Sequence, residues 1–225
     1  MKILIKNSKI LSMKNSDIIK SDILIDGKYI KKIEKNINDS VDRIIDASNM
    51  LTMPAFINCH SHVGMSLFRN YGKEVDLMTW LNDYIWPLED KLTDEDVYTA
   101  SQASFVEMVK NGIGSFADMY FFSEATIKAS IEIGIRGEIS RGLSIPDPDD
   151  YRLKENIMLY EKYKANDLIN IGLGPHAIYT SDIEHLKKVS DLADKYKMPI
   201  HIHLSETKQE NEECYKRYKM SPTEV

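Results

Sequence analysis

The chain has 225 residues, of which 43% are hydrophobic, and it carries a formal net charge of −6. This length and hydrophobic share are enough for a buried core and suit one large domain with a small one. The acidic balance argues against a nucleic-acid-binding surface, and no apolar run approaches the ~20 residues of a membrane span. Two cysteines and a charged N-terminus exclude a disulfide framework and a signal peptide, which favours the cytoplasm.

Residues 1–52 are expected to form a small β unit. Residues 22–30 read as a hairpin in which Asp26-Gly27 supplies the positive φ angles of a type I′ turn. Short apolar runs at 3–5 and 43–46 predict two more strands. No residue of this segment forms a pattern typical of catalysis.

Residues 53–225 alternate between strand and helix patterns, which predicts a parallel α/β fold. The expected strands cover residues 55–59, 113–118, 135–140, 169–174 and 199–204. Thr93 with Asp96, and Ser181 with Glu184, have the spacing of helix-starting capping boxes. No Gly-x-Gly-x-x-Gly loop follows a strand, which disfavours a dinucleotide-binding fold.

Polar residues stand at the carboxyl ends of these strands, where a (β/α)8 barrel places its active site. They are His60, His62, Asp118, Arg141, His176, His203 and Glu206. Only five βα units are present, whereas a full barrel takes about 250 residues. We therefore expect a TIM-type barrel truncated after about five units.

Two histidine pairs are the main chemical signal. His60 and His62 end an apolar strand with i, i+2 spacing, so both side chains point to one face and can share a metal ion. His201 and His203 repeat the pattern, and Glu206 follows. Either pair alone is also compatible with packed or solvated histidines, but four of the six histidines cluster here. His203 lies nearer the strand end and is the expected ligand, while His201 is expected to orient another ligand.

Several segments together carry a family resemblance. They are residues 54–62, 80–81, 85–92, 116–121, 172–177 and 201–207. These motifs resemble the amidohydrolase superfamily and, within it, the 5′-methylthioadenosine/S-adenosylhomocysteine deaminases, over essentially the whole chain. Ala55 stands where the family usually has glycine, and Ile178 where it often has proline.

The resemblance implies a metal-dependent (β/α)8 hydrolase whose N-terminal β unit is part of a composite β-sandwich. It implies one divalent ion, zinc or alternatively iron, held by His60, His62 and His203. The family's fourth ligand, an aspartate of the eighth strand, and a histidine of the sixth strand have no counterpart in these 225 residues. The sequence thus matches the N-terminal portion of the family.

The resemblance also implies hydrolytic attack at C6 of an adenine nucleoside, with Glu206 supplying a proton to N1 and contacting the substrate. Glu89 matches the ribose-binding carboxylate, and His176 matches a histidine that contacts the nucleoside. Arg141 and Arg152 match the arginines that meet the carboxylate of S-adenosylhomocysteine. The alternative for Glu89 is an ordinary acidic residue at the start of a helix. The alternative for Arg152 is a solvated side chain on the surface.

Other functions stay open at this point. Another amidohydrolase, such as a guanine deaminase or a triazine chlorohydrolase-like enzyme, would keep the same metal ligands. An inactive fragment or half of an assembly is the alternative from a different class, because a partial barrel leaves unpaired strand edges. We expect the isolated chain to be inactive and its ligand to be a small nucleoside. The sequence does not decide between a monomer and a homo-oligomer.

Overall fold

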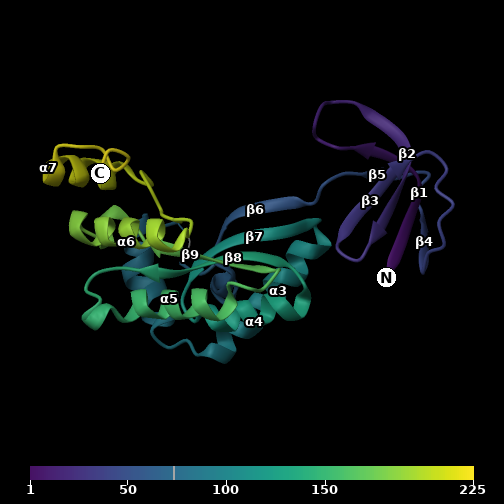
Figure 1. Cartoon of the computed structure of the whole chain (residues 1–225). Coiled ribbons are helices and arrows are strands. Elements are labelled where there is room, and N and C mark those ends of the chain that lie inside the picture. The colour runs from purple at the N-terminus through teal and green to yellow at the C-terminus, as the bar shows by residue number, and fades with distance from the viewer. Residues whose placement is uncertain (73) are drawn as a thin grey trace. The chain divides into compact units, whose positions relative to one another are not determined.

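The computed structural model describes residues 1–72 and 74–225, and the chain divides into two compact units, Met1–Ala55 and Phe56–Val225 (Figure 1). The first unit is a β-sheet with strand order β3-β2-β1-β4, in which β5 also pairs with β1. Its strands are β1 (Lys2–Leu11), β2 (Ile18–Asp26), β3 (Tyr29–Glu34), β4 (Arg43–Asp46) and β5 (Leu51–Thr52). Leu4, Leu24 and Ile37 form its small core.

The predicted hairpin joins β2 to β3, but its turn is not type I′. The antiparallel register ends at the pair Asp26 and Tyr29, so Gly27 and Lys28 form the turn. Gly27 has φ +61°, whereas Lys28 is not among the residues with positive φ. A type I′ turn needs positive φ at both central residues. The sequence therefore predicted the hairpin but placed the turn one residue too early.

The second unit is built on a parallel sheet with strand order β6-β7-β8-β9. Its strands are β6 (Phe56–Ser61), β7 (Ile113–Tyr120), β8 (Arg136–Leu143) and β9 (Ile169–Pro175). The predicted α/β class with a parallel sheet is confirmed. All four strands run in the same direction, so their carboxyl ends meet at one edge and bring distant residues together.

The fifth expected strand, residues 199–204, is reduced to isolated bridges of Leu173 with Ile200 and of Ala177 with His203. The segment still runs parallel to β9, since the His201 amide donates to Leu173 O and the His203 amide to His176 O, both at 2.9 Å. Among the described residues it has a sheet neighbour on one side only, and its pairing is correspondingly sparse.

Helices connect the strands and cover one face of the sheet, as Figure 1 shows for α3, α4 and α5. The longer helices are α3 (Asp94–Lys110), α4 (Ser123–Ile133), α5 (Tyr151–Tyr163), α6 (Ile183–Tyr196) and α7 (Lys208–Tyr218). Shorter helical turns precede α3: η1 (Val63–Phe68), α1 (Leu77–Thr79), η2 (Trp80–Ile85) and α2 (Trp86–Glu89). Two more, η3 (Pro148–Asp150) and η4 (Ile178–Thr180), precede α5 and α6. No helix in residues 1–72 or 74–225 combines the length and apolar character needed to cross a membrane.

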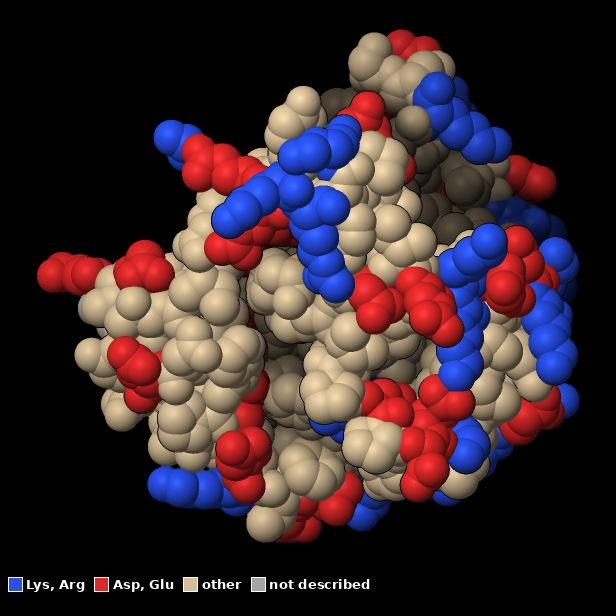
Figure 2. Space-filling view, turned by 90° about the vertical axis from the view of Figure 1, so that its left-hand side faces the viewer, with Lys and Arg blue, Asp and Glu red and all other residues tan. Residues whose placement is uncertain are grey.

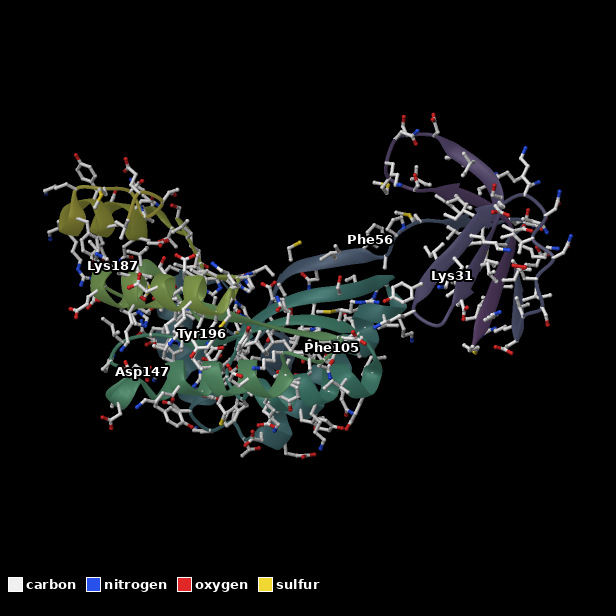
Figure 3. All side chains as sticks on the ribbon, viewed as in Figure 1. Lys31, Phe56, Phe105, Asp147, Lys187 and Tyr196 are labelled. Carbon is white, nitrogen blue, oxygen red and sulfur yellow. The ribbon has the colours of Figure 1, made fainter. Side chains whose placement is uncertain are left out.

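The core lies between this sheet and these helices. Phe105 of α3, labelled in Figure 3, is fully buried. Its ring packs against that of Phe116 of β7, with centroids 4.6 Å apart. The opposite face of the sheet is open: Ile57 of β6 is 67% exposed, and the neighbouring Cys59 is exposed as well. The sheet is thus buried on the helix side and exposed on its opposite face.

Two helix starts test the capping predictions. Thr93 caps α3 and forms the expected reciprocal capping box with Asp96. The start of α6 differs, because Asp182 is the cap and accepts the His185 amide at 2.7 Å. Ser181 was the predicted cap, and this prediction is wrong by one residue.

Candidate metal centre

Three histidines from the two ends of the second unit converge at the carboxyl edge of the sheet. His60 is the penultimate residue of β6, His62 directly follows the strand, and His203 lies beside β9. One ring nitrogen of each lies within 4.8 Å of the others. The ring centroids are 4.9 Å apart for His60 with either partner and 5.0 Å for His62 with His203. The structure thus brings together the three residues predicted as metal ligands.

The tautomer of His62 is set by the neighbouring strand. Its Nδ1 lies 2.5 Å from the carbonyl oxygen of Met119 on β7, and a carbonyl only accepts, so Nδ1 carries the proton. The lone pair is therefore on Nε2, which lies 3.1 Å from Nε2 of His203. Two nitrogens bound to one tetrahedral zinc at ~2.05 Å lie about 3.4 Å apart, so this spacing fits a shared ion.

His60 is oriented by the histidine that was not expected to be a ligand. Nδ1 of His60 lies 2.8 Å from Nε2 of His201, which leaves Nε2 of His60 for the shared site. This contact agrees with the expectation that His201 orients a ligand. Nδ1 of His201 and Nδ1 of His203 are buried and have no hydrogen-bond partner among the described residues.

Burial favours the neutral form of His62 and His203, which is the form that binds a metal. Desolvation, together with the smaller effect of the neighbouring histidines, lowers the pKa of His62 to about 4. The pKa of His203 is also lowered to about 4, chiefly by burial and then by His176. Neutral nitrogen donors of this kind suit zinc and other divalent transition metals.

A buried carboxylate supports the loop that carries His62. Asp118 of β7 is fully buried, and its Oδ1 accepts the Val63 amide at 2.7 Å and the Ser61 hydroxyl at 3.2 Å. These two residues flank His62 on either side. Burial raises the pKa of Asp118 to about 7, and its Oδ2 has no partner among the described residues. Asp118 was expected at the strand end, but its support of the histidine loop was not.

A cavity of about 370 Å³ opens beside the histidines. Its lining includes His60, His62, His176, His203, Glu89 and Glu206. Aromatic and apolar side chains form most of the remaining lining, among them Trp80, Trp86, Phe121, Tyr120, Tyr179 and Met65. A mostly apolar cavity with a few polar groups is typical of a small-molecule site.

Glu89 and Tyr120 lie next to each other in this cavity. Burial raises the pKa of Glu89. Burial and then the charge of Glu89 raise the pKa of Tyr120, whose hydroxyl is buried. Tyr120 was not among the predicted site residues, although it follows Met119 at the end of β7 and so occupies a strand end like the others.

Glu206 and His176 line the same cavity. The Tyr179 hydroxyl donates to Oε2 of Glu206 at 3.5 Å, and burial, followed by the charge of Glu210, raises the pKa of Glu206. Nδ1 of His176 lies 3.1 Å from the Thr180 hydroxyl, and burial lowers the pKa of His176 to about 4. Six of the eight site residues predicted from the sequence thus line one cavity.

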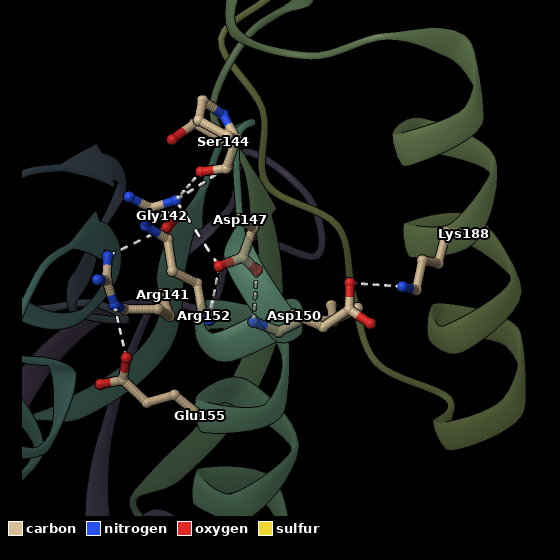
Figure 4. A network of polar contacts seen from close by, with 10 residues as sticks. Arg141, Gly142, Ser144, Asp147, Asp150, Arg152, Glu155 and Lys188 are labelled. Carbon is tan, nitrogen blue, oxygen red and sulfur yellow. Dashed lines mark hydrogen bonds and ion pairs between the residues drawn. The ribbon is translucent and has the colours of Figure 1, made fainter.

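The two predicted arginines are engaged outside the cavity lining (Figure 4). Arg141 pairs with Glu155 of α5 at 2.9 Å and lies over the Phe121 ring. Arg152 donates to the carbonyls of Ser144 and Pro146 and lies 3.7 Å from Asp147. The structure therefore places both arginines near the cavity rim, where Ser144 lies, but with their guanidinium groups already paired.

The surface around the end of the second unit that carries α6 and α7 has mixed charge. Figure 2 shows acidic and basic side chains interspersed on this face, without a large area of one sign.

Relatives with assigned names match the chain along its length. A protein of Caldanaerobacter subterraneus subsp. tengcongensis, named 5-methylthioadenosine/S-adenosylhomocysteine deaminase, is 44% identical over 100% of this chain and 53% of its own length. A protein of the same name from Pyrococcus furiosus is 42% identical over 99% of this chain and 54% of its own length. The chain thus spans about half the length of the curated relatives it matches.

Solved structures agree on the fold. A zinc-bound adenosine deaminase from Xanthomonas campestris has a TM-score of 0.93 and 23% identity, over 99% of this chain and 53% of that protein. A guanine deaminase from C. acetobutylicum with bound guanine has a TM-score of 0.84 and 23% identity, over 97% of this chain and 57% of that protein. At these identities the likeness concerns the fold alone.

The amidohydrolase family matches residues 51–225, the segment that contains both histidine pairs and the cavity. Family members depend on a metal, and the histidine triad supplies suitable donors. The resemblance read from the motifs is confirmed: this chain belongs to the amidohydrolase family.

Proposed function

We propose that this chain forms the N-terminal part of a metal-dependent hydrolytic deaminase that acts on adenine nucleosides. Its substrates would be 5′-methylthioadenosine and S-adenosylhomocysteine, and its products the inosine analogue and ammonia. The observation that carries the proposal is the convergence of His60, His62 and His203 within 4.8 Å, next to a cavity that holds a carboxyl group. The names of the relatives at 44% and 42% identity support this substrate class.

The proposed architecture is a (β/α)8 barrel of which this chain supplies the first strands. The parallel sheet β6-β7-β8-β9 with helices on one face is the geometry of such a barrel wall. The small β unit would belong to a composite sandwich. The high TM-score to the adenosine deaminase supports this proposal, since that protein has nearly twice the length.

We propose zinc as the bound ion, held by His60, His62 and His203. Bound there, it would supply Lewis-acid chemistry and lower the pKa of a water molecule towards ~7. His201 holds the ring of His60, and the Met119 carbonyl holds the ring of His62, so the chain itself presents two preoriented nitrogens. The zinc in the adenosine deaminase structure supports this choice over iron.

Glu206 is the proposed proton carrier. Its carboxyl lines the cavity, and partial desolvation raises its pKa, so it retains a proton at higher pH than a fully solvated glutamate does. A proton delivered from Glu206 to N1 of the purine would neutralise the charge that develops on the ring when C6 is attacked. The Tyr179 hydroxyl, which donates to Oε2, limits the directions in which this carboxyl can turn.

Glu89 and His176 are the proposed substrate contacts. Glu89 offers two acceptor oxygens, which suit the vicinal hydroxyls of ribose. His176 lines the wall of the cavity next to His203, with ring centroids 4.9 Å apart. Phe121 and Trp86 supply apolar walls that can stack on a purine and exclude water. Arg141 and Arg152 are proposed to meet a substrate carboxylate, which would have to compete with Glu155 and Asp147.

Ammonia release tests this proposal. The zinc-loaded chain is assayed alone and mixed with the complementary C-terminal half of the Caldanaerobacter relative, which supplies the remaining strands. We expect ammonia from methylthioadenosine and S-adenosylhomocysteine in the mixture, little from guanine, and none with His203→Ala. Release from guanine alone would favour a guanine deaminase, and no release from any substrate would favour an inactive fragment.

A further inference from the structure

Glu210 is a buried carboxylate that the proposed reaction does not use. It lies in the first turn of α7, and only 3% of its surface is exposed. Its Oε2 accepts a hydrogen bond from the backbone amide of Glu206 at 2.6 Å. Its Oε1 has no partner among the described residues. An acid is therefore buried directly behind the proposed proton carrier.

The contact differs from ordinary helix capping. Thr207 is the cap of α7, and its hydroxyl accepts the Glu210 amide at 3.0 Å. In a capping box the glutamate three residues after the cap accepts the amide of the cap residue itself. Here the carboxylate reaches one residue further back, to Glu206. The helix start is thereby attached to the residue that carries the proposed chemistry.

The segment between His203 and Glu206 needs such a restraint. Ser205 has φ +55°, in the left-handed region that a residue with a side chain rarely adopts. This conformation turns the chain between the strand end and α7, and it costs on the order of 1–2 kcal/mol. A charge-assisted hydrogen bond to the next amide offsets a cost of this size.

Three ionisable groups face Glu206 from three elements. Tyr179 lies on η4, Glu210 on α7, and His60 at the end of β6. The charge of Glu210 raises the pKa of Glu206, while Tyr179 and His60 lower it. Glu210 is the only one of the three that both touches the backbone of Glu206 and opposes the loss of its proton.

We propose that Glu210 is a positioning residue that fixes Glu206 in the cavity through the backbone amide of Glu206. This inference rests on the proposed role of Glu206 as proton carrier. Glu210 itself touches neither the substrate nor the histidine triad; it acts through the turn at Ser205 and through its charge.

Three variants of the zinc-loaded chain separate the two effects of Glu210. Glu210→Gln keeps an acceptor for the Glu206 amide but removes the charge, and Glu210→Ala removes both. Glu212→Gln is the matched control, because Glu212 lies on the same helix with a side chain that is 65% exposed. Far-UV circular dichroism checks that α7 is retained in each variant.

The first readout is hydrogen exchange of the Glu206 backbone amide. We expect exchange to be roughly tenfold faster in Glu210→Ala and near the wild-type rate in Glu210→Gln and Glu212→Gln. The second readout is the carboxyl ¹³C titration of Glu206, in which Glu210→Gln should lower the pKa and Glu212→Gln should not. Where the complemented chain releases ammonia, Glu210→Ala should lower kcat roughly 10- to 100-fold with little change in KM.

Unchanged exchange in Glu210→Ala, or an unchanged Glu206 pKa in Glu210→Gln, would overturn the proposal. If Glu210→Ala loses α7, the titration of Glu210→Gln alone decides. If the wild-type chain releases no ammonia even when complemented, the proposed function fails, yet exchange and titration still report whether Glu210 holds Glu206. The two failures are thus distinguishable.

Discussion

Nδ1 of His60 lies 2.8 Å from Nε2 of His201, although 141 residues separate them in the chain. We expect His201→Ala to weaken zinc binding roughly 10- to 100-fold, because the His60 ring loses the contact that directs its Nε2 towards the site. Competition with a chromophoric chelator measures the dissociation constant. His201→Gln should recover part of the affinity, since its carbonyl can accept from Nδ1.

His185 provides the control for this experiment. It lies at the start of α6, bonded to the Ser181 hydroxyl at 3.1 Å and outside the cavity lining. His185→Ala should leave zinc affinity unchanged. Equal losses in the His201 and His185 variants would contradict a specific role for the His60–His201 contact.

Because the three histidines share one site, we expect the loss of His62 or of His203 to abolish metal binding. His62→Ala and His203→Ala each leave two ring nitrogens, too few to hold zinc at equimolar concentration. Elemental analysis after gel filtration should give about one zinc for the wild type and near zero for either variant. Cys59→Ser, next to His60 in sequence, should retain the metal; its loss there would indicate a thiolate ligand instead.

Because Asp118 is buried, we expect the stability of the fold to decrease as the pH rises. Its pKa is about 7 in the folded chain and 3.8 when unperturbed. Between these values the folded chain holds a proton that the unfolded chain has lost, so the free energy of unfolding falls as pH rises from about 4 to 7. The gap corresponds to on the order of 4 kcal/mol.

Urea unfolding at pH 5 and pH 8, with chelator present, measures this fall. Asp118→Asn keeps an acceptor for the Val63 amide but cannot titrate, so its loss of stability between the two pH values should be smaller than in the wild type. Identical pH dependence in both proteins would show that Asp118 is not the responsible group.

The ion pair between Arg141 and Glu155 predicts a change in ligand preference. Glu155→Gln removes the charge that competes for the Arg141 guanidinium. We expect the variant to bind S-adenosylhomocysteine severalfold more tightly and methylthioadenosine, which has no carboxylate, with unchanged affinity. Calorimetry measures both, and Glu161→Gln, on the exposed side of α5, is the control.

Equal changes for the two nucleosides would argue against a carboxylate contact at Arg141. Tighter binding of neither ligand would favour a structural role, in which Arg141 only ties β8 to α5. In that case Arg141→Gln should destabilise the fold by about 1–3 kcal/mol without altering the ratio of the two affinities.

The histidine triad could be predicted from the sequence because strand geometry is local. Residues i and i+2 share a face, so His60 and His62 had to point together, and the parallel fold brought His203 to the same edge. The Thr93 cap was predictable because a capping box is also local: it joins two residues three positions apart. At Ser181 two adjacent residues can both cap, and the sequence alone does not decide between Ser181 and Asp182.

Side-chain partners from other elements were harder to predict. Arg141 follows the family motif, but the direction of its guanidinium depends on Glu155 of the next helix. Tyr120 and Tyr179 look like ordinary core aromatics in the sequence, and their place in the cavity depends on the way the strand ends meet. The Asp118 contact with Val63 likewise depends on the register between β6 and β7.

The two segments that supply the histidines lie at opposite edges of the sheet, β6 on one side and the segment bridged to β9 on the other. An ion held by His60, His62 and His203 therefore closes a loop of 141 residues, much as a covalent cross-link does. Chelation should release both edges in concert, so that the amides of His60 and His203 begin to exchange together while those of the central strands β7 and β8 stay protected.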